Sequence, residues 1–292
     1  MYINRMSKGE AVFEILNIIF MIMFSLLCLY PFIYILNISI SEGISPAQYG
    51  LNILPKGVTL RFYKNVFATD AIYMGFLTSV FRTVAGTLLM VTFTILGAYP
   101  LSKKYMPSRK FWTSFILITM FFNGGLIPNY FLIRYLGLID KIWSLILPGL
   151  INTFYLIVTR NFMMTIPEDL EESAKIDGAN SIKILISIIL PVCKPILATI
   201  ALWSAVYHWN SWFDCLIYIT NPKLAVLQVI LYRIVNAGSN VVVTGSLSGD
   251  EAPFPEVLKA CTIIITILPI VVVYPFLQKY FIKGILVGSV KG

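Results

Sequence analysis

The stretch that decides the fold begins with Glu172-Ser173-Ala174-Lys175-Ile176-Asp177-Gly178-Ala179 and ends with Ile188-Ile189-Leu190-Pro191. It is charged and is broken by a glycine, yet long apolar runs precede and follow it. Charged side chains are costly inside a bilayer, so this segment is expected in water between two membrane spans. We interpret it as a surface that another protein grips from outside the bilayer.

The composition around this segment is that of an integral membrane protein. Of the 292 residues, 58% are hydrophobic and 12% are charged, whereas a soluble domain carries about 25% charged residues. The net charge of +8 comes mostly from short connections between apolar runs, which is typical of membrane topology and not of nucleic-acid binding. Four scattered cysteines, which we expect as small core residues, and one histidine, His208, predict neither a metal site nor a disulfide set.

Six apolar segments are long enough, or nearly so, to cross a bilayer as helices of about 20 residues. We therefore expect an all-α integral membrane protein with a single transmembrane domain over residues 1–292. The expected spans cover residues 12–40, 71–102, 111–134, 142–160, 182–214 and 258–281. Pro191 and Pro195 should bend the first turns of the fifth span, because each proline removes a backbone donor.

The basic residues indicate on which side of the membrane the termini lie. Six spans place both termini on one side, and the connection of residues 102–110 carries four basic residues and no acidic one. The positive-inside rule places such a loop in the cytoplasm. We therefore expect both the N and the C terminus to be cytoplasmic.

Two of the expected outer loops, residues 42–70 and 220–257, are long. The first should hold a short helix near 60–67. The second carries apolar residues at helical spacing, which predicts an amphipathic helix. Such a helix could lie on the membrane surface, bind a partner or simply cover the bundle. The residues that define its apolar face are Leu227, Ile230, Leu231 and Ile234.

Residues 165–183 are predicted to form two helices joined by an elbow. Pro167 suits the first helical position, and the acidic residues after it suit the positive end of the helix dipole. A helix of about residues 167–177 should end at Gly178, because glycine accepts left-handed backbone angles. Asn180 or Ser181 can then cap the next helix.

One face of the first of these helices is suited to contact with another protein. Helical spacing places Leu170, Ser173 and Ala174 together on it. Two of the three are small, so the groove of a partner could approach the backbone closely.

This segment resembles the motif E-A-A-x-x-D-G-A-x8-I-x-L-P of the membrane subunits of ABC importers. The matching residues are Glu172, Ala174, Asp177, Gly178, Ala179, Ile188, Leu190 and Pro191, with Ser173 in place of the first alanine of the motif. The resemblance extends over nearly the whole chain. Residues 98–102, 122–128 and 274–281 resemble carbohydrate-uptake permeases of the maltose-transporter type, in the subgroup that handles complex oligosaccharides.

The resemblance implies a type I ABC importer permease fold with a cytoplasmic coupling helix, in the bacterial inner membrane. It implies as partners a paralogous second permease subunit, two ATPase subunits, an extracytoplasmic solute-binding protein and a sugar or oligosaccharide substrate. This chain has no G-x-x-x-x-G-K-[ST] phosphate loop, so ATP and Mg²⁺ should bind to the ATPase subunits. We expect a transporter subunit without a cofactor, not an enzyme.

The resemblance also assigns roles to residues of the elbow. The positions carried over as ATPase-coupling residues are Leu170, Glu172, Ser173, Ala174, Asp177, Gly178 and Ala179. Glu172 and Asp177 would supply polar contacts. Capping within the elbow is a second possible role for Asp177, and Gly178 is expected to shape the turn.

The fifth span carries the candidate substrate path. Trp203, Tyr207, Asn210 and Asp214 recur every three or four residues and should share one helical face. Aromatic faces and hydrogen-bonding groups bind sugars, and a polar stripe inside a membrane usually faces a cavity or a neighbour. The same residues would also suit an aromatic belt at the membrane interface, with Asp214 at the outer end of the helix.

Two further functions are compatible with parts of this sequence. A permease for another solute would share the same motif, and an intramembrane glycan or lipid transferase would need clustered acids or a histidine–acid site. The single histidine and the few intramembrane acids argue against the transferase. Arg82, inside the second span, could pair with an acid, face water, snorkel to the membrane interface or bond to loop carbonyls. The sequence does not identify the sugar.

Overall fold

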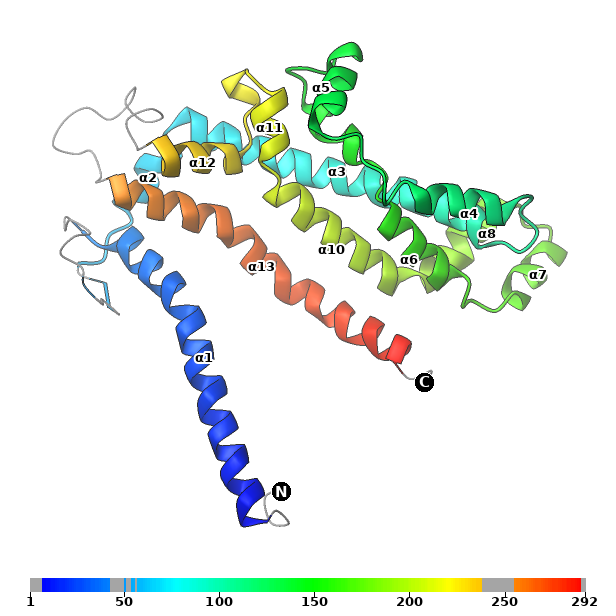
Figure 1. Cartoon of the computed structure of the whole chain (residues 1–292), viewed down its shortest axis with the longest axis horizontal. Coiled ribbons are helices and arrows are strands. Elements are labelled where there is room, and N and C mark those ends of the chain that lie inside the picture. The colour runs from blue at the N-terminus through cyan, green and yellow to red at the C-terminus, as the bar shows by residue number, and fades with distance from the viewer. Residues whose placement is uncertain (1–6, 43–49, 51–53, 56, 238–254, 290–292) are drawn as a thin grey trace. The chain divides into compact units, whose positions relative to one another are not determined.

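The computed structural model describes residues 7–42, 50, 54–55, 57–237 and 255–289 (Figure 1). These residues form helices, turns and one isolated bridge between Ser41 and Val58, so the all-α expectation is confirmed for them. The chain divides into two units. One unit comprises Met1–Thr69 and Ile234–Thr266, and the other comprises Asp70–Arg233 and Ile267–Gly292.

The first unit is built on the long helix α1 (Lys8–Ile40). Its start is a capping box, in which Ser7 Oγ accepts from the Glu10 amide at 3.3 Å and Glu10 Oε2 accepts from the Ser7 amide at 2.7 Å. The short helix expected near 60–67 is present as α2 (Arg61–Phe67). It is attached to α1 because the Tyr63 hydroxyl donates to Ser39 Oγ at 2.7 Å.

The second unit is organised around α3 (Asp70–Ser102), which corresponds to the expected second span. Along α3 runs a buried stripe of mostly small residues, and α6 (Thr153–Met163) and α10 (Lys194–Asn210) pack along the helix (Figure 1). Small residues let membrane helices approach closely. At Gly86 the approach is so close that a Cβ atom would lie 2.5 Å from Nε2 of His208.

The segment expected as a third span is not one continuous helix. It forms two ten-residue helices, α4 (Arg109–Ile118) and α5 (Leu126–Tyr135). Between them Gly125 adopts a φ of +82°, and its amide donates to Asn123 Oδ1 at 2.8 Å. The expected span over 111–134 is therefore interrupted at Gly125, where this local hydrogen bond replaces a helical one.

The expected fourth and fifth spans are bent. The 3-10 turns η3 (Ile142–Leu145) and η4 (Leu147–Gly149) meet α6 at 48°. In the fifth, the segment before Cys193 meets α10 at 81°, which confirms the bend expected from Pro191 and Pro195. That segment comprises α8 (Ser181–Ile184), the π-helix η5 (Leu185–Ile189) and α9 (Leu190–Val192).

The described residues contain three helices long and apolar enough to cross a membrane, or up to five if each bent pair is one span. The three are Gly9–Ile40, Asp70–Ser102 and Glu256–Val273, the last within α13 (Pro255–Ser289). Of the four cysteines expected in the core, Cys193, Cys215 and Cys261 are buried, but Cys28 is exposed on α1.

The expected amphipathic helix is present as α12 (Leu227–Ala237). Its residues Leu227 and Ile230 are buried, and the Leu227 amide donates to Ser79 Oγ of α3 at 2.8 Å. Ile230 also lies directly over Gly75 of α3. Of the three roles open to this helix, the structure shows that it covers the bundle.

Two connections distant in sequence are joined through Asp140. Its carboxylate accepts hydrogen bonds from the amides of Thr220 (2.6 Å) and Asn221 (2.8 Å) and from the Thr220 hydroxyl. Its own amide donates to the carbonyl of Tyr218 at 3.0 Å. This contact holds the turn after α5 against the loop between α11 (Phe213–Tyr218) and the 3-10 turn η6 (Pro222–Leu224).

These hydrogen bonds predict a pH dependence of stability. The hydroxyl of Thr220 and the amides of Asn221 and Thr220 hold the pKa of the Asp140 carboxyl below its ordinary value. A lowered folded-state pKa stabilises the fold above the unfolded-state value of about 3.9, and this stabilisation is lost as the pH falls through the folded-state pKa. We expect Asp140→Asn to lower the thermal midpoint of the purified protein at neutral pH, with the difference shrinking at acid pH. Parallel curves for the two proteins would contradict this role.

Candidate functional site

The elbow of the importer-like motif starts with α7 (Asp169–Ile176), whose N-cap is Glu168. The carbonyl of Glu168 accepts from the amides of Glu171 (2.9 Å) and Glu172 (3.0 Å). Pro167 therefore precedes the helix, and its expected place as the first helical residue is wrong. The reason is that the chain is still closing the end of α6 there, where the Ile166 amide donates to the Met163 carbonyl at 3.3 Å.

Gly178 ends α7 as the sequence predicts. Its φ is +77°, its amide donates to the Lys175 carbonyl at 3.0 Å, and the Ala179 amide donates to the Ala174 carbonyl at 2.9 Å. This pair of bonds is a Schellman motif. Asn180 then caps α8, since its Oδ1 accepts from the Lys183 amide at 2.8 Å.

The two faces of α7 differ from the sequence-based expectation. Ala174 is buried in a cluster with Ala98 and Tyr99 of α3, so it does not share an open face with Leu170 and Ser173. Helix packing, which the motif alone does not reveal, turns Ala174 inward. The other coupling residues carried over lie on the surface or close to it: Leu170, Glu172, Ser173, Asp177 and Gly178 are exposed, and Ala179 is half-buried.

The structure also identifies residues of α7 that the sequence analysis did not single out. Ile176, on the open side of α7, is 87% exposed. Glu171, on the inner side, forms an ion pair with Lys103, the residue after α3. Ile176 could have been found from its spacing to Ser173, but no local pattern links two residues 68 positions apart.

The candidate substrate residues are not all on one helix. Because α10 ends at Asn210 and α11 starts at Phe213, Asp214 belongs to a separate element, and the expected single face is wrong for it. Trp203 packs against Phe154 and Tyr155 of α6 with tilted rings, whose centroids lie 5.7 and 5.6 Å away.

Three of the four candidate residues nevertheless come together. Tyr207, Asn210 and Asp214 line one open hollow of about 500 Å³ at the junction of α10 and α11. Val206, Ser211, Trp212 and Phe213 complete its lining. Aromatic rings, an amide and a carboxylate around an open hollow can stack on and hydrogen-bond to a polar ring such as a sugar.

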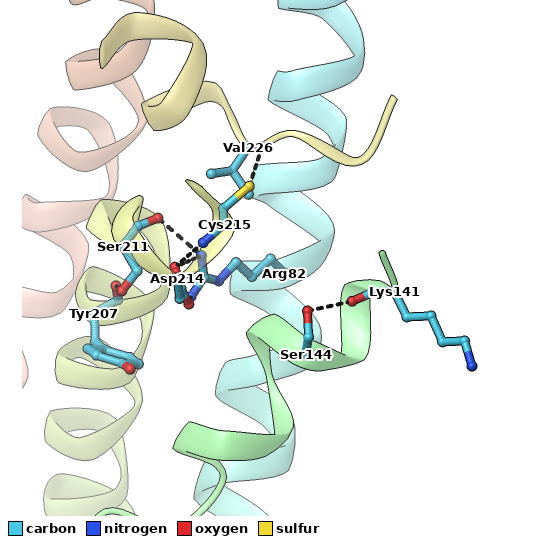
Figure 2. Close-up of polar contacts among 8 residues, drawn as sticks. All are labelled: Arg82, Lys141, Ser144, Tyr207, Ser211, Asp214, Cys215 and Val226. Atoms are coloured by element: carbon cyan, nitrogen blue, oxygen red, sulfur yellow. Dashed lines mark hydrogen bonds and ion pairs between the residues drawn. The ribbon is translucent and has the colours of Figure 1, made fainter. Parts of the chain in front are cut away.

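The carboxylate of this hollow is paired with Arg82. Figure 2 shows Arg82 reaching from α3 to Asp214 at the start of α11. Its Nη1 donates to Asp214 Oδ1 at 3.2 Å and to the Ser211 carbonyl at 3.1 Å, and its Nη2 pairs with Asp214 Oδ2. Of the roles left open for Arg82, the structure shows both acid pairing and carbonyl binding. The Arg82 side chain is fully buried, so the pair neutralises a charge that the bilayer would exclude.

His208 is packed inside the second unit. It is buried against Gly86, and both ring nitrogens lack a hydrogen-bond partner among the described residues. Over the same residues, no group of three or more His, Cys, Asp or Glu side chains gathers where a metal ion could bind.

Proteins of known sequence and structure are similar to this chain over nearly its whole length. No family model matches the chain. The protein LplC of Bacillus subtilis is 40% identical over 286 residues, which cover 98% of this chain and 97% of the relative. The polygalacturonan/rhamnogalacturonan transport system permease protein YtcP of the same organism is 40% identical over 281 residues, which cover 96% and 98%.

A solved structure shares the fold. It is described as a bacterial ABC transporter involved in the import of the acidic polysaccharide alginate. The match has a TM-score of 0.86 and 31% sequence identity, and it covers 94% of this chain and 99% of that one.

These findings define the class as a helical permease subunit of an ABC importer. The chain belongs to the family of sugar and oligosaccharide ABC transport permeases. It is a transporter subunit and not an enzyme, which excludes the intramembrane transferase.

The pairing of Arg82 with Asp214 predicts a specific pattern of stabilities. Arg82→Met leaves the Asp214 carboxylate without its partner, and breaking a buried pair costs about 3–5 kcal/mol. The double variant Arg82→Met with Asp214→Asn removes both charges and keeps an oxygen for the Cys215 amide, which donates to Asp214 Oδ1 at 2.8 Å. We expect thermal unfolding in detergent to show a large loss for the single variant and a smaller loss for the double.

The exposed arginine of α5 offers a control, since Arg134→Met removes a charge without a buried partner. Equal losses in the single and double variants would show that Arg82 does not stabilise the fold through Asp214.

Proposed function

We propose that this chain forms, together with a second permease chain, the translocation path of an ATP-driven importer, and that α7 is its coupling helix. The observation that carries the proposal is the open face of α7. Leu170, Ser173 and Ile176 recur at a spacing of three, and Leu170 is 45% and Ile176 87% exposed. A helix closed by a Schellman motif that exposes two apolar side chains beside acidic ones is suited to dock in another protein's groove.

In this proposal the chain crosses the bacterial inner membrane six times, with both termini in the cytoplasm. The two bent pairs and the α4–α5 segment would account for the third, fourth and fifth spans. Broken helices are tolerated at membrane depth where protein or a water-filled cavity surrounds the freed backbone groups. Breaks beside the hollow at Asn210 therefore support a path for a polar solute along α10.

The partners proposed are two ATPase subunits that bind ATP and Mg²⁺, the second permease chain and an external solute-binding protein. ATP-driven closure of the ATPase pair would displace α7. The spans would then exchange between inward-open and outward-open arrangements, with each ligand favouring the state that it binds more tightly.

For the substrate we propose an acidic oligosaccharide. The relatives support this class, because one is named for polygalacturonan and rhamnogalacturonan and the solved transporter for the acidic polysaccharide alginate. The hollow is compatible with an anionic sugar because Asp214, the acidic residue in its lining, is paired with Arg82. Its carboxylate would otherwise repel a uronic acid.

Docking of α7 is tested by placing charges on its open face. Leu170→Asp together with Ile176→Asp should reduce co-purification of the ATPase subunits with the permease about tenfold or more, since about 1.4 kcal/mol corresponds to tenfold in affinity. The matched control is Leu54→Asp, an equally apolar residue that is 76% exposed in the expected outer loop. Unchanged co-purification of the double variant would refute the coupling role of α7.

The substrate path is tested by uptake into proteoliposomes that hold the full complex and its binding protein. Tyr207→Ala removes a stacking surface, and Asn210→Ala removes a hydrogen-bonding group. Each is worth about 1 kcal/mol of binding free energy. We expect uptake of radiolabelled trigalacturonate to fall about fivefold in each variant at limiting substrate. The control is Tyr135→Ala, which changes an exposed tyrosine outside the hollow.

The same vesicles test the charge of the substrate. We expect them to accumulate trigalacturonate but not maltotriose. Preference for maltotriose would overturn the acidic assignment, and unchanged uptake in both hollow variants would overturn the path.

A further inference from the structure

The end of α3 and the coupling helix are joined by a buried ion pair. Lys103 directly follows α3, and its ammonium group pairs with Glu171 in the first turn of α7. The two side chains are only 12% and 9% exposed. The same ammonium group lies 4.4 Å from the centroid of the Tyr99 ring, so a carboxylate and an aromatic face hold it together.

Neighbouring contacts align α7 with this junction. Lys175 lies 4.8 Å from the centre of the Tyr105 ring, and Ala174 packs in the cluster that holds Ala98 and Tyr99. Lys104 pairs with Glu168 at 3.0 Å, but those side chains are 76% and 58% exposed. An exposed ion pair contributes little to stability, whereas breaking a buried one costs several kcal/mol. The Lys103–Glu171 pair is therefore the stronger connection between α3 and α7.

Nearer its start, α3 carries a second ion pair, in which the arginine is fully buried. Arg82 lies twenty residues before Ser102, which is about 30 Å along the helix axis, and it holds Asp214 in the wall of the hollow. Figure 1 shows α7 and α11 toward opposite ends of α3. α3 is one continuous helix over this length, with Pro100 inside it, so the two pairs are joined through a single element.

We propose that Lys103 and Glu171 form a clamp through which displacement of α7 is passed to α3 and, by way of Arg82 and Asp214, to the hollow. The clamp rests on the proposed function, in which an ATPase moves α7. Lys103 and Glu171 act as positioning residues in it. Both lie on the inner side of the junction, away from the open face formed by Leu170 and Ile176.

The experiment follows the response of the hollow to nucleotide in the complete complex. A fluorescent label is placed on Phe213→Cys, in the lining of the hollow, with Cys28→Ser because Cys28 is exposed whereas Cys193, Cys215 and Cys261 are buried. A non-hydrolysable ATP analogue with Mg²⁺ is then added. We expect a shift of the label's emission in the parent complex.

Reversal of one charge should uncouple the two sites. Lys103→Glu and Glu171→Lys each place like charges together, so the shift should be lost although the ATPase subunits remain bound and bind the analogue. Combining the two changes restores an ion pair of opposite polarity and should restore most of the shift. Lys104→Glu, the same reversal one residue later in the exposed pair, should leave the shift unchanged.

Each result bears on the clamp. If the complex does not assemble with a reversed charge, Glu171→Gln keeps the shape and a hydrogen bond to Lys103 and should give a reduced shift. A full shift in the single reversals or in Glu171→Gln would overturn the clamp alone. No shift in the parent complex with bound analogue would instead overturn the coupling between the ATPase and the hollow, and the clamp with it.

Discussion

The second unit depends on the burial of one positive charge. Arg82 lies in the middle of α3, fully enclosed, and a charge in such a place must be paired. Its guanidinium binds the Asp214 carboxylate and the Ser211 carbonyl. Both groups are available only because α10 ends at Asn210 and the chain turns before α11. The end of α10, the position of Asp214 and the hollow beside it therefore all meet at this one pairing.

The same helix organises the packing around it. Small residues on α3 allow α6, α10 and α12 to approach, and Gly86 leaves room for the ring of His208. At two places along its length α3 contacts elements with different proposed roles. One end holds α7 through Lys103, and the part nearer its start holds α11 through Arg82. A single stiff element thus connects a surface suited to a partner protein with a hollow suited to a polar solute.

Predictions from helix-capping and turn residues were accurate where residues close in sequence decide the structure. The end of α7 at Gly178 and the cap at Asn180 depend on backbone angles and on bonds across a few positions. Predictions from helical spacing failed for the face that Asp214 was expected to share with Tyr207, and the expected span 111–134 is interrupted between α4 and α5. Hydrophobic periodicity assumes that a helix continues, whereas these helices are interrupted where other hydrogen bonds replace the helical ones.

The sequence by itself determined that this is an all-helical membrane protein, that an elbow joins α7 and α8, and that the chain belongs to the importer family. These conclusions rest on the composition, the turn residues and the motif, each of which involves only the residues themselves and their order along the chain. Tertiary structure decided that Ala174 faces inward, that Ile176 faces outward, and that Lys103 meets Glu171 and Arg82 meets Asp214. These contacts join residues 68 and 132 positions apart. A buried charge selects its partner by proximity in the packed fold, and no spacing along the chain encodes that choice.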